Sequence, residues 1–252
     1  MFDTAPSYKD IFNKRADSYH QAMLQWPNAR DKEFQALLEN LNISAEDKVI
    51  DIPSGGGYLS WYVNQAQLHH IETSETFAQL CHSKSPYPLT ICELDKLPFN
   101  DDSIDFVLSL AGLHHTETKL GLFQQINRIL KPGGRCMLAD AKKGSKTAVF
   151  LDGWMADHNS MGHKGWYFDS ETADELVSSG LIVDKIETKD YHWKFDSVSQ
   201  AAQYCQLMFG IDQASLKDIE NALLEHLGGT QDSSNFLLNW QLDFISCHKK
   251  HL

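Results

Sequence analysis

Apolar positions between residues 45 and 140 follow two spacings in turn, that of buried strands and that of amphipathic helices. Short Val-, Ile- and Leu-rich runs predict strands at 48–52, 68–72, 89–92, 104–109 and 135–140. Helices are predicted at 58–65, 74–83 and 119–130, the last ended by the Pro and Gly residues of 131–134. Strands and helices that alternate in this way predict an α/β domain, with a mostly parallel sheet covered by helices on both faces.

Helical patterns extend beyond both ends of this region. Residues 8–25 and 28–41 predict two helices interrupted near Pro27, so we expect residues 1–44 to form a helical cap on a domain spanning 45–252. The later predicted elements are a helix at 170–179, a strand from 181 to 186 with a continuation to 193, helices at 197–227 and an alternating strand at 240–246. We therefore expect the last strand of the same sheet to follow a helical insertion at about 197–230. The segment 154–167 is expected to be a loop.

Composition narrows the classes of partner. The chain carries 22 Lys and Arg against 34 Asp and Glu, a formal net charge of -12, which argues against nucleic acid and anionic membranes as partners. The five cysteines are widely spaced without a C-x-x-C pair, which argues against a disulfide framework and a structural zinc site. The N-terminus lacks a signal-peptide pattern and no run of apolar residues is long enough to span a bilayer, so a cytoplasmic protein is expected.

A glycine loop, Asp51-Ile-Pro-Ser-Gly-Gly-Gly57, joins the first predicted strand to the following helix. Glycine lets a ligand approach the backbone closely, although tight strand-to-helix turns also use glycine for steric reasons alone. Glu72 ends the second predicted strand, where a carboxylate can accept both hydroxyl hydrogens of a ribose or simply face solvent. A dinucleotide dehydrogenase would carry Gly-x-Gly-x-x-Gly, but the residue three positions beyond Gly57 is Ser60.

Taken in order, five segments within residues 45–140 resemble the class I S-adenosylmethionine-dependent methyltransferases of type 11. They are the glycine loop with Pro53 in place of its first glycine, Glu93-Leu-Asp-Lys-Leu-Pro-Phe99, Ser103-Ile-Asp-Phe-Val107, His114-His115 and Arg128-Ile-Leu-Lys-Pro-Gly-Gly134. The resemblance implies a Rossmann-like, seven-stranded sheet whose last strand is antiparallel, which agrees with the strand predicted at 240–246. It also implies S-adenosylmethionine as the cofactor.

The resemblance further implies which residues hold that cofactor. The implied set is Tyr19, Arg30, Asp51, Ser54, Gly55, Gly56, Gly57, Glu72, Thr73, Glu93, Leu94, Leu110 and Ala111. Asp51 and the loop backbone would hold the amino-acid end, Glu72 the ribose and Glu93 with Leu94 the adenine. Leu110 and Ala111 would lie on the sulfonium side. Tyr19 and Arg30 resemble residues that close over the cofactor, but the aromatic spacing of the first helix also fits plain packing.

Histidines are the candidates for the acceptor side. A hydroxyl or phenol acceptor needs a general base, and His115 and His163 follow predicted strands at the edge of the sheet where ligands bind. The alternatives are that His115 and its neighbour His114 only pack against the cofactor pocket, and that His163 is a solvated loop residue. Asp152, Asp157, His158 and His163 could also supply oxygen and nitrogen ligands to a metal ion. Their spacing matches no defined metal site, so none is expected.

These observations predict transfer of a methyl group from S-adenosylmethionine to a small-molecule acceptor. Two alternatives are a non-catalytic, methyltransferase-like protein that binds a cofactor or a partner, and a methyltransferase acting on RNA or protein. The Asn/Asp-Pro-Pro-aromatic signature of amide and exocyclic-amine methylators is replaced by Ser109-Leu-Ala-Gly112. No nucleic acid and no membrane is expected as a partner, and the sequence leaves a homodimer open.

Overall fold

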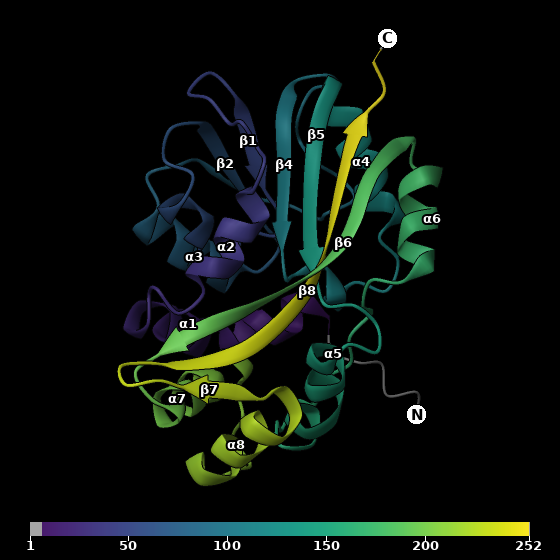
Figure 1. The fold of residues 1–252 in the computed structure, drawn as a ribbon. Helices are drawn as coiled ribbons and strands as arrows, with labels where there is room; N and C mark the ends of the chain where they lie inside the picture. The colour runs from purple at the N-terminus through teal and green to yellow at the C-terminus, as the bar shows by residue number, and fades with distance from the viewer. Residues whose placement is uncertain (1–6, 252) are drawn as a thin grey trace.

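One sheet organises the computed structural model, which describes residues 7–251 (Figure 1). Its strand order is β3-β2-β1-β4-β5-β8-β6, and β7 pairs with β8 outside this path. The strands are β1 (Lys48–Asp51), β2 (Gln67–Glu72), β3 (Leu89–Ile91), β4 (Ile104–Leu110), β5 (Leu130–Asp140), β6 (Leu181–Phe195), β7 (Gly229–Gln231) and β8 (Phe236–Lys249). Residues 1–6 lie outside the described residues. Part of the expectation that the chain has no signal peptide rests on these residues.

The pairing confirms the predicted sheet. Strands β1 to β5 pair in parallel, whereas β8 runs antiparallel between β5 and β6. The last strand of the Rossmann-like sheet is therefore antiparallel, as predicted, and the short β7 is an addition that the sequence did not indicate. Among residues 7–251, no helix combines the length and the apolar character that crossing a membrane requires.

Helices cover both faces of this sheet (Figure 1). They are α1 (Tyr8–Gln25), α2 (Asp31–Leu38), α3 (Glu75–Lys84), α4 (Leu120–Ile129), α5 (Lys146–Phe150), α6 (Ser170–Ser178), α7 (Val198–Phe209) and α8 (Leu216–Ala222). Four shorter helical segments are η1 (Tyr58–Trp61), η2 (Leu113–His115), η3 (Leu151–Met155) and η4 (Leu223–Leu227). Helix α1 begins with a capping box in which Ser7 and Asp10 exchange side-chain and backbone hydrogen bonds.

Three sequence predictions were wrong in extent. The helix expected at 58–65 is only the single turn η1, because Trp61, Tyr62 and Val63 are aromatic or β-branched residues with weak helix propensity. The expected loop 154–167 starts as helix, since η3 continues α5 and buries Leu151 and Met155. The final strand is twice the expected length, because β8 pairs with β6 from end to end.

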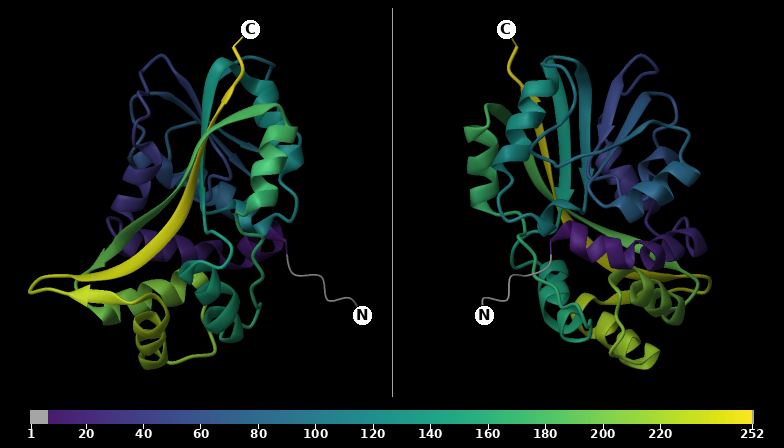
Figure 2. Two further views of the ribbon diagram at one scale, coloured as in Figure 1. Left: turned by 45° about the vertical axis from the view of Figure 1, so that its right-hand side comes forward. Right: turned by 180° about the vertical axis from the view of Figure 1, so that it is seen from behind.

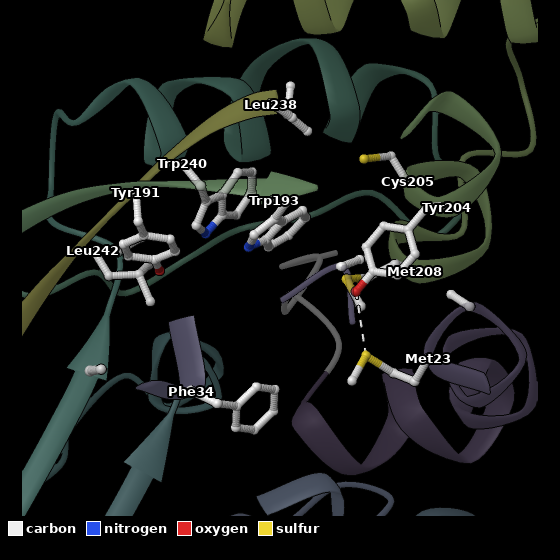
Figure 3. Packing of buried hydrophobic residues seen from close by; sticks show 14 of the residues in the cluster. Met23, Phe34, Tyr191, Trp193, Tyr204, Cys205, Met208, Leu238, Trp240 and Leu242 are labelled. Carbon is white, nitrogen blue, oxygen red and sulfur yellow. Dashed lines mark hydrogen bonds between the residues drawn. The ribbon is translucent and has the colours of Figure 1, made fainter. Parts of the chain in front are cut away.

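The long ends of β6 and β8 leave the main sheet and carry an aromatic core with them (Figure 2). On these strands the rings of Trp193 and Trp240 stack with centroids 4.0 Å apart, and Tyr204 of α7 packs on the edge of Trp193 (Figure 3). The Tyr204 hydroxyl contacts the sulfur of Met23 in α1 at 3.3 Å. Burial of these large side chains fixes the insertion helices against α1.

Helix α1 lies between the insertion and the carboxyl ends of the parallel strands (Figures 1 and 2). The arrows of β4 and β5 point toward α1 in Figure 1. In open α/β sheets, ligands bind outside the carboxyl ends of the strands. The fold therefore encloses the expected binding edge between the sheet and two helical additions.

Candidate active site

The glycine loop makes a tight turn directly after β1. Gly55 and Gly57 have φ angles of 53° and 76°, a region that favours glycine. A Cβ on Gly56 would lie 2.5 Å from the Tyr58 hydroxyl, and one on Gly57 would lie 2.5 Å from the sulfur of Cys81. Steric demands thus account for these glycines, which is the alternative that the sequence left open. The turn η1 is too short to supply the amides of a regular helix N-terminus.

Glu72, at the end of β2, is completely buried and accepts four hydrogen bonds. Its Oε1 accepts from the amides of Thr73 and Ser74, both at 2.8 Å. Its Oε2 accepts from the amide of Gly55 at 2.7 Å and from the Tyr8 hydroxyl at 3.0 Å. Burial outweighs these donors and raises the pKa of Glu72 to about 7. The acid is therefore not a solvated strand-end residue, and Tyr8 covers it.

Asp51 ends β1 and joins a second buried hydrogen-bond chain. Its Oδ2 lies 3.0 Å from Nδ1 of His70, whose Nε2 lies 2.9 Å from the Ser85 hydroxyl. Burial raises the pKa of Asp51, although the His70 imidazole acts in the opposite direction. The chain fixes the orientation of the Asp51 carboxyl group.

A small cavity, which we call the loop cavity, opens in front of this loop. Its lining includes Asp51, Ser54, Gly55, Leu110, Ala111, Tyr8, Phe12, Tyr19 and Arg30. The Ser54 hydroxyl is buried and has no nitrogen or oxygen partner among the described residues. A buried hydroxyl without such a partner suits a polar ligand in this cavity.

Arg30 and Tyr19 form the outer wall of the loop cavity. Arg30 is buried, donates to the Tyr19 hydroxyl at 2.6 Å and pairs with the buried carboxylate of Glu33. Glu33 also accepts from the indole nitrogen of Trp193 at 2.6 Å. Arg30 is thus held by a rigid network rather than free in solvent.

A second small cavity, which we call the histidine cavity, adjoins the first. Both cavities are lined by Phe12, Tyr19, Arg30 and Ala111. The remainder of the histidine cavity is largely apolar, with Leu151, Met155, Trp193, Met208, Phe209, Trp240 and Leu242. Figure 3 shows Trp193, Trp240, Met208 and Leu242 converging from β6, α7 and β8. Only the fold brings these elements to one wall.

His114, His115 and His163, which we call the histidine cluster, form the polar end of this cavity. One ligand nitrogen from each ring lies within 4.8 Å of those of the other two. Burial, followed by the neighbouring imidazoles, lowers the pKa of His115 well below its ordinary value of 6.5. Burial also lowers the pKa of His163, although Asp152 acts in the opposite direction. The structure therefore brings the two predicted catalytic histidines together in neutral form.

Two carboxylates form hydrogen bonds with rings of the histidine cluster. His114 Nδ1 lies 2.7 Å from Oδ1 of Asp140, and His163 Nδ1 lies 2.7 Å from Oδ1 of Asp152. No hydrogen bond joins either ring nitrogen of His115 to another described residue. Two of the three rings are thus oriented by hydrogen bonds, whereas His115 is held by aromatic contacts, including one with Tyr8.

Other predicted residues lie away from the two cavities. Glu93 is exposed and Leu94 is half-buried against the core below the sheet, and neither lines either cavity. His158 is also separate, because its Nδ1 bonds the carbonyl of Trp154 and its ring stacks on that indole. Asp152, Asp157, His158 and His163 therefore do not come together as one metal-binding group among the described residues. His163 lies beside His114 and His115 instead.

Sequence reasoning missed several residues of the site. Arg15 of α1 lines the histidine cavity and donates to the carbonyl of Met208 at 2.8 Å. Asp140 ends a predicted strand, which was a usable signal because such ends meet at the binding edge. Trp193 and Trp240 gave no signal, since aromatic residues on strands usually pack in the core.

Comparisons with known proteins agree with this geometry. The family model described as methyltransferase domain matches residues 50–138. The uncharacterized methyltransferase sll0829 of Synechocystis is 30% identical over 152 residues, which cover 58% of this chain and 68% of that protein. The malonyl-[acyl-carrier protein] O-methyltransferase of Marinomonas is 25% identical over 215 residues, which cover 80% and 73% of the two chains.

A solved structure shows the same fold over nearly all of the chain. The Haemonchus contortus phosphoethanolamine N-methyltransferase 2, in complex with S-adenosyl-L-methionine, superposes with a TM-score of 0.65 at 15% identity. The match covers 98% of this chain and 60% of that one. At this identity the likeness concerns the fold alone.

Proposed function

The chain belongs to the class I S-adenosylmethionine-dependent methyltransferases, and on that premise we propose that it transfers a methyl group from S-adenosylmethionine to a small-molecule acceptor. The observation that carries the proposal is the wall shared by the loop cavity and the histidine cavity, at Ala111 and Tyr19. A donor in the first cavity and an acceptor in the second would meet there. Most of the catalytic effect of such a transfer comes from positioning.

The loop cavity offers groups that suit the cofactor. The Asp51 carboxyl group and the buried Ser54 hydroxyl would hold the amino-acid end, with Leu110 and Ala111 near the sulfonium. When bound, S-adenosylmethionine supplies an electrophilic methyl group on a positively charged sulfur. Glu72 would accept the ribose hydroxyls, which requires Tyr8 to release its carboxylate oxygen. The adenine contacts of Glu93 and Leu94 remain a proposal from the family pattern.

The histidine cavity favours an acceptor with an apolar body and an oxygen nucleophile. Trp193, Trp240 and Met208 offer stacking and apolar contact, while the histidine cluster faces the polar end. His115 would take the acceptor's proton on a ring nitrogen, since its nitrogens are not engaged by the described residues. The acceptor oxygen then bonds to the methyl carbon as the carbon–sulfur bond breaks, and that electron pair stays on sulfur. The Marinomonas relative is likewise named as an O-methyltransferase.

Two features favour a small acceptor over a macromolecule. The histidine cavity is lined by residues of both helical additions, among them Phe12 and Arg15 of α1 and Met208 of α7. The net charge of -12 also works against a nucleic-acid substrate. No cytoplasmic location and no assembly state follow from these features, and both stay as sequence expectations.

Calorimetry with S-adenosylmethionine and S-adenosylhomocysteine tests the cofactor part. We expect the purified chain to bind both, and Ser54→Ala to weaken binding while Glu46→Gln, at an exposed position, does not. Release of S-adenosylhomocysteine with a panel of phenols, aliphatic alcohols and carboxylic acids then tests the transfer. His115→Ala should bind the cofactor normally and lose turnover. Absence of binding of either cofactor form would refute the proposed function.

A further inference from the structure

We propose that His114, His115 and His163 together bind one divalent transition-metal ion, of which Zn²⁺ is the representative. Their ligand nitrogens lie within 4.8 Å of one another on the wall of the histidine cavity. Two imidazole nitrogens on a tetrahedral Zn²⁺, with bonds of about 2.0–2.1 Å, are roughly 3.3 Å apart. Binding therefore requires the ligand nitrogens to approach one another by up to about 1.5 Å. Imidazole nitrogen is a preferred ligand for zinc, copper, iron and nickel.

The hydrogen bonds behind the rings select the nitrogens that face the ion. His114 and His163 each engage Nδ1 with a carboxylate oxygen at 2.7 Å, so Nε2 is the nitrogen that keeps a lone pair for an ion. A carboxylate bonded to the far nitrogen of a ligating histidine fixes its tautomer and raises its basicity. This arrangement occurs twice here, through Asp140 and Asp152.

The two carboxylates are themselves firmly held. Asp140 accepts from the amides of Leu113, His114 and Ala141 at 2.7–2.9 Å. Asp152 accepts from the amide of Gly165 at 2.9 Å and from the Tyr167 hydroxyl at 2.8 Å. Both rings are therefore oriented before any ion binds, which lowers the cost of forming the site.

Charge favours a cation over an anion at this place. The cavity lining carries two guanidinium groups, Arg15 and Arg30, and two carboxylates, Glu33 and Asp140. Asp152, which is bonded to His163, adds a third carboxylate beside the cluster, so the formal charge around the cluster is -1. An anionic ligand would meet these carboxylates, whereas imidazole lone pairs suit a metal cation.

Three protein ligands leave a coordination position open, as in catalytic rather than structural zinc sites. The cluster lines the same cavity as Ala111, where the donor methyl group is proposed to lie. With His115 as a ligand, the ion takes over activation of the acceptor from that ring. The open position would hold the acceptor oxygen as an anion after its proton has left to solvent, and this role rests on the proposed function. The metal binding itself rests on the geometry of the cluster. It departs from the sequence expectation of no metal site, and it makes Asp152 a positioning residue instead of a ligand.

Titration of the chelator-treated full chain with Zn²⁺, and separately with Co²⁺, tests the site. We expect one tight site by calorimetry and a visible tetrahedral absorption band with Co²⁺. His163→Gln and His115→Ala should abolish both signals, whereas His192→Ala, at an exposed position of β6, should leave both unchanged. Tight binding that survives the two cluster substitutions would show that other histidines bind the ion, and would overturn the proposal.

A more conservative substitution separates loss of metal binding from loss of folding. Asp152→Asn keeps the shape of the side chain that orients His163, so we expect a folded protein with metal affinity reduced by about 10–100-fold. An unchanged affinity would contradict the proposed orientation. Absence of Zn²⁺ and Co²⁺ binding in a chain that binds S-adenosylmethionine would refute the metal site alone, whereas metal binding without cofactor binding would refute the methyl transfer alone.

Discussion

Replacing Glu72 by glutamine is expected to remove a pH dependence from the stability of the folded protein. The carboxyl group of Glu72 is fully buried, and its pKa is about 7 in place of the ordinary 4.5 because burial outweighs its four donors. Glutamine keeps nearly the same shape but does not titrate. The substitution therefore isolates the contribution of this one group.

The sign and size follow from proton linkage. Between pH 4.5 and 7 the folded chain keeps the proton on Glu72 while the unfolded chain has released it. The folded state then binds more protons, so the free energy of unfolding falls as pH rises through this window. A pKa difference of about 2.5 at about 1.4 kcal/mol for each pH unit gives a loss of about 3 kcal/mol.

Urea denaturation at intervals from pH 4.5 to 8 measures this loss. We expect the free energy of unfolding of the parent chain, minus that of Glu72→Gln, to fall by about 3 kcal/mol across the range. The amide cannot accept from all four donors, so the variant is less stable at low pH, and only the pH dependence of the difference is decisive. Glu46→Gln, at an exposed position, should give a flat difference. A flat difference for Glu72→Gln as well would refute the reasoning.

Two further substitutions test the packing around the site. Glu33→Gln leaves Arg30 buried without its counter-charge and should lower the free energy of unfolding, measured by urea denaturation, by about 3–5 kcal/mol. Adding Arg30→Met should recover part of that loss. No recovery would show that the broken ion pair is not the cause. Gly57→Ala should lower the free energy of unfolding by at least about 1–3 kcal/mol, through its φ of 76° and the contact with Cys81. The same change in a Cys81→Ala background should cost less, and equal costs in both backgrounds would rule out that contact.

Elements with strong local signals were predicted well. Ile104–Leu110 is rich in Ile, Phe, Val and Leu and forms β4 almost as predicted. The helix at 119–130 matches α4, whose buried positions Leu122, Phe123 and Ile126 recur at helical spacing. The helix predicted at 58–65 forms only the turn η1, because eight residues of mixed helix propensity do not make a stable helix.

Residues of the candidate site also differ in how well local sequence signals predicted them. Asp51, Glu72 and the glycine loop were predicted from strand ends and one tight turn. Asp51, Ser54 and Gly55 line the loop cavity, whereas Glu72 lies outside its lining. Glu93 does not line the loop cavity, since the turn after β3 leaves its side chain exposed. Tyr8 was treated only as a packing residue, yet it donates to Glu72 across 64 positions of sequence.

The sequence by itself determined the order of strands and helices and the glycine loop after the first strand, while the antiparallel direction of the last strand followed from the family resemblance. The first two features depend on side-chain period and on backbone constraints that act within a few residues. Only the tertiary structure decided that His163 meets His114 and His115, and that Trp193 and Arg15 close the same cavity. Their meeting depends on how α1 and the long ends of β6 and β8 pack together, which is a balance of distant contacts that no local pattern encodes.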